Sequence, residues 1–151
     1  MTNQPVEFAF AITGSKCDSF NFSKFAIDNK ENIAFDKYRF SFTIRIDVEK
    51  EKELVIVKLG TTLAKLENDQ EIIATLDSTT VFKVLNLSKF LIENAEGTLI
   101  PDPIVIQFFS IAISNARGMF TIKLADSIYS NAVVPIIDVS KMIQKKPSNI
   151  A

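Results

Sequence analysis

Residues 101–118 read PDPIVIQFFSIAISNARG, and this stretch decides the fold because it carries the signals for both ends of a helix. Asp102 is a favoured N-cap residue, and Pro103 suits the first helical position, where its missing N–H would have no partner. Gly118 is typical of the left-handed residue that follows a helix. The sequence therefore predicts a main helix over residues 101–118 that is capped by Asp102 and ended by Gly118.

The predicted helix is apolar around most of its circumference. Its polar residues form one narrow stripe, which consists of Gln107, Ser110, Ser114 and Arg117. A surface helix needs an apolar face of only about 100°. We therefore expect one side of this helix to pack on its own sheet and another side to contact a second subunit or an apolar polypeptide. The residues expected at the subunit interface are Val105, Phe108, Phe109, Ala112 and Ile113, with ordinary core packing as the alternative for each.

Most of the chain before the helix has the alternating pattern of half-buried strands. The predicted strands span residues 6–12, 39–48, 54–66 and 71–85, and Gly60 inside the third suggests a bulge or a bend. The charged run 49–53 is expected to form a solvated connection. Short links between successive strands favour antiparallel neighbours. The fold expected is α+β, a four-stranded antiparallel sheet with a long helix in the C-terminal half and a short last helix on one face.

The other segments are less regular, and we expect one domain over residues 1–151, with residues 1–100 mainly β-sheet. Residues 15–36 are interpreted as a crossover connection that contains Phe20, Phe22 and Phe25. A short helix is expected near residues 87–92. The segment 119–145 is predicted to be an extended arm followed by a last helix over residues 138–145, and residues 146–151 are predicted to be a tail, with residues 144–151 basic.

Composition excludes several classes of function. The net charge of −1 argues against a nucleic-acid binder. The chain has no histidine and one cysteine, Cys17, which argues against an enzyme, a metal site or a cofactor. The first residues do not have the pattern of a secretory signal, and the uncharged run 103–116 is shorter than a membrane span requires. We expect a cytoplasmic protein that is not inserted in a membrane.

The order of elements and two C-terminal motifs resemble the SecB-like chaperones, the fold of the bacterial protein-export chaperones. The motifs are Arg117-Gly118-Met119-Phe120, placed at the end of the main helix, and the apolar segment 135–143 that begins with Pro135. The resemblance implies a dimer-of-dimers assembly that holds unfolded polypeptides in apolar grooves without ATP or metal. The near-neutral charge differs from the acidic export chaperones and favours a specialised member over one that docks on SecA.

The function expected from the resemblance is that of an ATP-independent holdase, which binds apolar segments of unfolded client polypeptides. The alternative is a structural or regulatory homo-oligomer, a dimer or a tetramer, whose apolar face serves only self-association. Aromatic and flexible apolar side chains suit promiscuous recognition. The expected polypeptide-binding residues, all partly exposed, are Phe20, Phe22, Phe25, Met119, Phe120 and Ile122.

Overall fold

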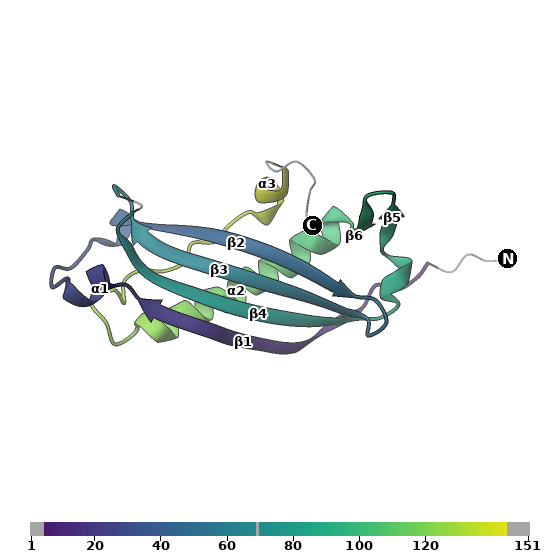
Figure 1. Ribbon diagram of the computed structural model, residues 1–151, viewed down its shortest axis with the longest axis horizontal. Coiled ribbons are helices and arrows are strands. Elements are labelled where there is room, and N and C mark those ends of the chain that lie inside the picture. Colours follow the sequence, from purple (N-terminus) through teal and green to yellow (C-terminus); the bar gives the residue numbers. More distant parts are fainter. Residues whose placement is uncertain (1–4, 69, 145–151) are drawn as a thin grey trace.

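The computed structural model describes residues 5–68 and 70–144 and shows a four-stranded antiparallel sheet with one long helix against one face (Figure 1). The strands of this sheet are β1 (Phe10–Phe22), β2 (Tyr38–Glu49), β3 (Leu54–Lys65) and β4 (Ile72–Val84). The helices are α1 (Lys24–Asp28), α2 (Asp102–Leu124), α3 (Val139–Gln144) and two 3₁₀ turns, η1 (Phe35–Lys37) and η2 (Leu87–Lys89). A separate hairpin consists of β5 (Ile92–Asn94) and β6 (Gly97–Leu99). The α+β fold predicted from the sequence is confirmed.

The strand order in the sheet is β1-β4-β3-β2, so the first strand pairs with the fourth. Short turns join β2 to β3 and β3 to β4, as the lengths of the links predicted. The charged run 49–53 forms the first of these turns, where Glu53 adopts a φ of 54°. Because β1 and β2 lie at opposite ends of this order, they are the two edge strands of the sheet.

Gly60 lies in a regular part of the sheet, so of the bulge or bend predicted there, the bulge is wrong. Its neighbours in register are Thr43 on β2 and Asp77 on β4. The irregularity of the β3–β4 pairing lies between Leu63 and Ala64 instead. A Cβ atom built on Gly60 would lie 2.5 Å from the Oγ1 atom of Thr43, which explains the glycine by close packing.

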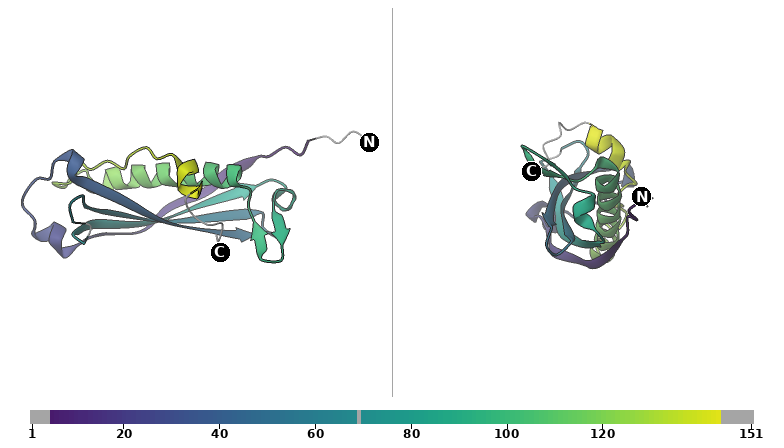
Figure 2. Two further views of the ribbon diagram at one scale, coloured as in Figure 1. Left: turned by 90° about the horizontal axis from the view of Figure 1, so that it is seen from above. Right: turned by 90° about the vertical axis from the view of Figure 1, so that its right-hand side faces the viewer.

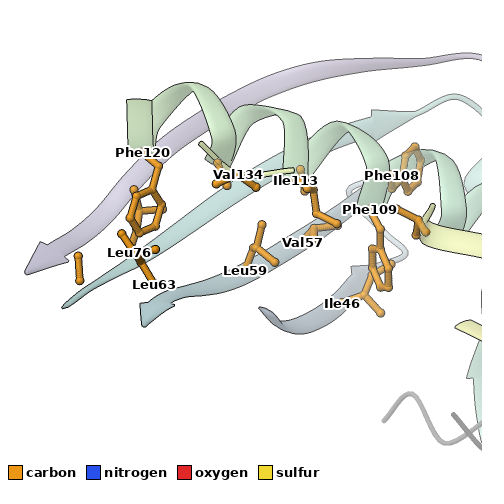
Figure 3. Packing of buried hydrophobic residues seen from close by; sticks show 14 of the residues in the cluster. Ile46, Val57, Leu59, Leu63, Leu76, Phe108, Phe109, Ile113, Phe120 and Val134 are labelled. Atoms are coloured by element: carbon orange, nitrogen blue, oxygen red, sulfur yellow. The ribbon is translucent and has the colours of Figure 1, made fainter. Parts of the chain in front are cut away.

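The core forms where α2 crosses one face of the sheet (Figure 2). Figure 3 shows residues of α2 such as Phe109 and Ile113 pointing toward Ile46 and Val57 of the sheet. Toward the N-terminal end of α2, the Phe82 and Phe108 rings stack with centroids 4.2 Å apart. The buried residues of α2 are Val105, Phe108, Phe109, Ala112, Ile113, Ala116, Phe120 and Leu124.

The main helix is longer than predicted at its C-terminal end. Its N-cap is Pro101 and Asp102 is its first residue, so the prediction that Asp102 caps it is wrong. The helix continues through Gly118 to Leu124, so the prediction that Gly118 ends it is wrong as well. Burial of Phe120 and Leu124 against the sheet explains this. Each contributes on the order of 2 kcal/mol, more than the roughly 1 kcal/mol that a glycine costs inside a helix. Met119, Phe120 and Ile122 therefore lie on α2, not on an extended arm.

The first strand is also longer than predicted. The predicted strand was residues 6–12, whereas β1 begins at Phe10, passes through Gly14 and reaches Phe22. Bulges between Ile12 and Gly14 and between Cys17 and Ser19 interrupt the alternation of apolar residues, which hid the second half of the strand. Phe20 and Phe22 consequently lie on β1, and only Phe25 lies in the crossover, on α1.

The remaining segments include one further correction. The helix predicted near residues 87–92 is instead η2 followed by the β5–β6 hairpin, in which Gly97 has a φ of 131°. Residues 125–138 connect α2 to α3, the predicted last helix, and Asp138 caps α3 by accepting a 3.1 Å hydrogen bond from the backbone N–H of Ser140. The predicted tail 146–151, residue 145 and Asp69 lie outside the described residues.

Candidate polypeptide-binding site

The five residues predicted at a subunit interface are buried inside the chain's own core. Their exposed fractions lie between 0% for Phe108 and 6% for Phe109. These side chains have no free surface for a second subunit, so the interface prediction is wrong for all five. They are Val105, Phe108, Phe109, Ala112 and Ile113.

Three of the predicted polypeptide-binding residues meet in an aromatic cluster near the end of α2. The ring centroid of Phe20 lies 5.0 Å from that of Phe22 and 5.7 Å from that of Phe120. Phe40 of β2 contacts the other side of Phe120, with centroids 5.8 Å apart. Phe120 is only 1% exposed, so its predicted exposure is wrong, while Phe20 and Phe22 are partly exposed. The buried ring of Phe120 thus contacts Phe20, which in turn contacts Phe22.

One side of α2 faces β1. Residues spaced by three or four lie on the same side of a helix, and Phe108, Ile111, Asn115, Met119 and Ile122 have this spacing. The Phe108 ring contacts that of Phe10 on β1, with centroids 5.0 Å apart. Asn115 donates a 3.4 Å hydrogen bond from Nδ2 to Oγ1 of Thr80 on β4. Met119 and Ile122 therefore lie on the side of α2 that β1 borders.

A band of partly exposed apolar side chains runs between β1 and α2. On β1, Cys17 and Phe20 pair in register with Ser78 and Leu76, which are buried on the helix-covered face. Ile122 is 76% exposed, and the other members are partly buried. We call this band the apolar seam, and it consists of Cys17, Phe20, Ile111, Met119 and Ile122.

The opposite side of α2 is covered by residues 125–138, the connecting arm. Arg117 Nε donates a 2.9 Å hydrogen bond to the carbonyl of Val134, and Nη2 donates a 3.0 Å bond to that of Pro135. In the end-on view of Figure 2, α3 and β1 lie on opposite sides of α2. The arm therefore leaves the apolar seam uncovered.

Hydrogen bonds of two tyrosines hold the arm against α1 and β2. The hydroxyl of Tyr129 donates a 2.9 Å hydrogen bond to the carbonyl of Ala26. The hydroxyl of Tyr38 donates a 2.9 Å bond to Oδ1 of Asn131, whose Nδ2 donates to the carbonyl of Ile33. Burial raises the pKa of Tyr38, and the nearby Tyr129 raises it further. The arm thereby places the Tyr129 ring beside Phe22 of the aromatic cluster, with ring centroids 6.1 Å apart.

Phe25 does not belong to the seam. Its ring lies under the ammonium group of Lys65, with Nζ 4.9 Å from the ring centroid, at the end of β3. The seam members that sequence reasoning missed are Cys17 and Ile111. The spacing of Ile111 from Met119 would have identified it once the helix was known to continue past Gly118.

The seam offers apolar contacts and an edge strand, and its chemistry fits recognition of apolar side chains. Among residues 5–68 and 70–144, no group of three or more His, Cys, Asp or Glu side chains is placed to hold a metal ion. By length and composition alone, α2 has the profile of a membrane-spanning helix. A helix that packs in a protein core has the same profile, and α2 buries eight residues in this way.

Comparison with known proteins supports the fold alone. The sequence matches no protein-family model, and no curated protein sequence is similar to it. The structure is similar to the Rv1957 SecB-like chaperone of Mycobacterium tuberculosis, solved in complex with a ChAD peptide from the Rv1956 HigA1 antitoxin. The TM-score is 0.54, the identity is 11%, and the match covers 85% of this chain and 87% of that chain. The chain therefore has a SecB-like fold.

Proposed function

We propose that this chain is a holdase that binds apolar segments of unfolded polypeptides at the apolar seam without ATP. The observation that carries the proposal is the seam itself, since it presents one exposed and four partly exposed apolar side chains on a sheet-and-helix frame. Cys17, Phe20 and Met119 pack against the core from one side, so they present a preformed apolar surface on the other. The SecB-like fold supports the proposal by analogy.

The edge position of β1 supplies the second element of the proposed site. Its ladder partner is β4, and within the part of the chain that the structure describes no strand pairs with its other side. An extended peptide added to such an edge gains main-chain hydrogen bonds that do not depend on its sequence. Apolar side chains of the same peptide would then contact Phe20 and Met119. This combination suits a protein that binds many different unfolded chains.

The test is suppression of aggregation of a chemically denatured protein. Ile122→Asp should weaken suppression, because it places a charge in the seam at a side chain that is 76% exposed and needs no refolding of the core. The matched control is Ile136→Asp on the arm, where the side chain is 92% exposed and lies outside the seam. Circular dichroism checks that both variants keep the fold. Equal activity of the two variants, or an inactive wild type, would contradict the proposal.

The alternative function, a homo-oligomer that uses its apolar face only on itself, involves the same edge. The observation in its favour is that β1 is an edge strand and that Phe20 and Met119 beside it are partly exposed. A second copy that pairs along β1 would cover both side chains. Light scattering with and without an unfolded protein separates the two functions. A stable oligomer whose mass never increases with the unfolded protein supports the alternative.

A further inference from the structure

The free edge of β1 offers main-chain hydrogen-bonding groups at Phe20 and Phe22. Phe22 pairs in register with Ala74 of β4, and one residue further the backbone N–H of Ser23 donates a 2.9 Å hydrogen bond to the carbonyl of Ile73. Hydrogen-bonded and non-hydrogen-bonded pairs alternate along an antiparallel ladder, so Phe22 and Phe20 belong to non-hydrogen-bonded pairs. Their N–H and C=O groups therefore point away from β4, toward the side of β1 on which no strand pairs within the described part of the chain.

The side chains of the same two residues lie on the helix-covered face. Phe20 pairs in register with Leu76, which is buried on this face, and the ring centroids of Phe20 and Phe22 are 5.0 Å apart. An antiparallel strand added at this edge would place one residue opposite each phenylalanine. Because side chains alternate between the faces of a sheet, these two residues would point to the helix-covered face, and the residue between them would point to the open face, beside the exposed Asn21. The edge therefore suits a segment that is apolar, polar and apolar in turn.

A bulge at Asp18 interrupts this edge on its N-terminal side. Cys17 pairs in register with Ser78, and Phe20 pairs with Leu76. The two residues of β4 are two positions apart, whereas the two residues of β1 are three positions apart, so Asp18 is an extra residue in β1. A regular peptide repeats its side-chain direction every two residues. A peptide that pairs C-terminal to the bulge therefore falls out of register when it reaches Cys17.

Contacts on the open face hold the bulge in place. The Asp18 carboxylate accepts a hydrogen bond from the hydroxyl of Thr79, and its Oδ1 lies 3.5 Å from Nζ of Lys16. Next to it, Oγ of Ser19 donates a 3.0 Å hydrogen bond to Oδ2 of Asp77. The bulge is therefore a fixed feature of this edge strand, and such features limit pairing with other chains.

The available edge also ends directly after Phe22. Ser23 is the N-cap of α1, so the chain turns into a helix there, and the Tyr129 ring lies beside Phe22 with centroids 6.1 Å apart. The edge between the bulge and α1 thus offers the main-chain groups of Phe20 and Phe22 alone. We propose that the bulge at Asp18 determines which client segments the seam selects. It restricts the paired part of a client to three residues, whose first and third side chains are apolar and face the helix-covered side.

This inference rests on the proposed function and specifies the client segment. The probes are two short peptides of the same composition, with valine–threonine–valine or valine–valine–threonine between flanks of glycine and serine. In an NMR titration of the full chain, the alternating peptide should bind about fivefold more tightly, because both of its valines form cross-strand pairs. It should also shift the amide signals of Phe20 and Phe22. A peptide with three alternating valines should lower the Kd by no more than about twofold, because the bulge prevents a third pair.

Deletion of Asp18 removes the extra residue from β1. In this variant the peptide with three alternating valines should bind about fivefold more tightly than the peptide with two, since the ladder can continue. The matched control is deletion of Thr13, the extra residue of the other bulge, which lies between Ile12 and Gly14 and should leave the ratio as in the wild type. Circular dichroism checks the fold of both variants, and the comparisons on the wild type decide the question if a deletion unfolds the protein.

The outcomes separate this inference from the proposed function. Equal binding of the two peptides of the same composition, or a fivefold gain from the third valine in the wild type, would overturn the inference. A wild type that suppresses aggregation of a denatured protein but binds neither peptide would overturn the inference and leave the proposed function standing. A homodimer in which the amides of Phe20 and Phe22 are protected from hydrogen exchange, and which takes up neither peptide nor denatured protein, would overturn both.

Discussion

Arg117 Nε donates a 2.9 Å hydrogen bond to the carbonyl oxygen of Val134, which fixes the connecting arm along α2. A second bond reaches the carbonyl of Pro135. Arg117→Ala should therefore lower the free energy of unfolding by about 1–2 kcal/mol. It should also speed protease cleavage within residues 125–138. Lys123→Ala serves as the control for loss of a helix cation. An Arg117→Ala protein as stable and as protease-resistant as the wild type would contradict this account of the arm.

Gly118 lies inside α2, and a Cβ atom built on it meets nothing within 4 Å. Gly118→Ala should raise the free energy of unfolding by about 0.5–1 kcal/mol, because alanine restricts the unfolded chain and favours helix. Gly97→Ala is the contrasting variant and should destabilise, since Gly97 has a φ of 131°. Chemical denaturation measures both. Destabilisation by Gly118→Ala would show that the helix ends at Gly118 after all.

Gly60 lies against Thr43, whose Oγ1 atom would be 2.5 Å from an added Cβ. Gly60→Ala should lower the free energy of unfolding by about 1–3 kcal/mol through overpacking. Thr43→Ala in the same chain removes the hydroxyl and should recover most of this loss. A double-mutant cycle by chemical denaturation measures the coupling. Strictly additive effects of the two substitutions would mean that the contact does not limit this position.

Tyr38 is partly buried, and burial raises its pKa above the ordinary value of 10.0. The folded state therefore keeps the phenol proton at a pH where the unfolded state loses it. The resulting stability is fully present below pH 10.0 and is lost as the pH rises through the pKa of the folded state. In a Tyr129→Phe variant, Tyr38 is the only tyrosine, and tyrosinate absorbance reports it alone. Titration at the same pH in folded and denatured protein would contradict the burial.

The sequence predicted the fold class because alternation and helix periodicity are local properties. The patterns of β2, β3 and β4 identified their strands, and the short links fixed their antiparallel neighbours. Alternation did not show which strand lies at an edge. Phe42 packs against the core, yet it is only partly buried because β2 is an edge strand.

The errors arose where tertiary packing overrides a local signal. Gly118 has the character of a helix stop, but burial of Phe120 and Leu124 extends α2 by further turns. Bulges in β1 concealed the strand position of Phe20. The candidate site was predicted in part: Phe20, Met119 and Ile122 belong to the seam, whereas Phe120 supports it from the core. Cys17 could be identified as a seam residue only from the pairing of β1 with β4, which the sequence did not predict.

The most direct measurement of the central claim is site-specific photocrosslinking to an unfolded polypeptide. Cys17→Ser removes the single cysteine, and Ile122→Cys or Ile136→Cys then places a thiol-linked benzophenone at one exposed position, inside or outside the seam. With a reduced and carboxymethylated protein as the client, position 122 should crosslink to the client and position 136 should not. Equal crosslinking from both positions, or crosslinks from position 122 to other copies of this chain alone, would contradict a polypeptide-binding seam between β1 and α2.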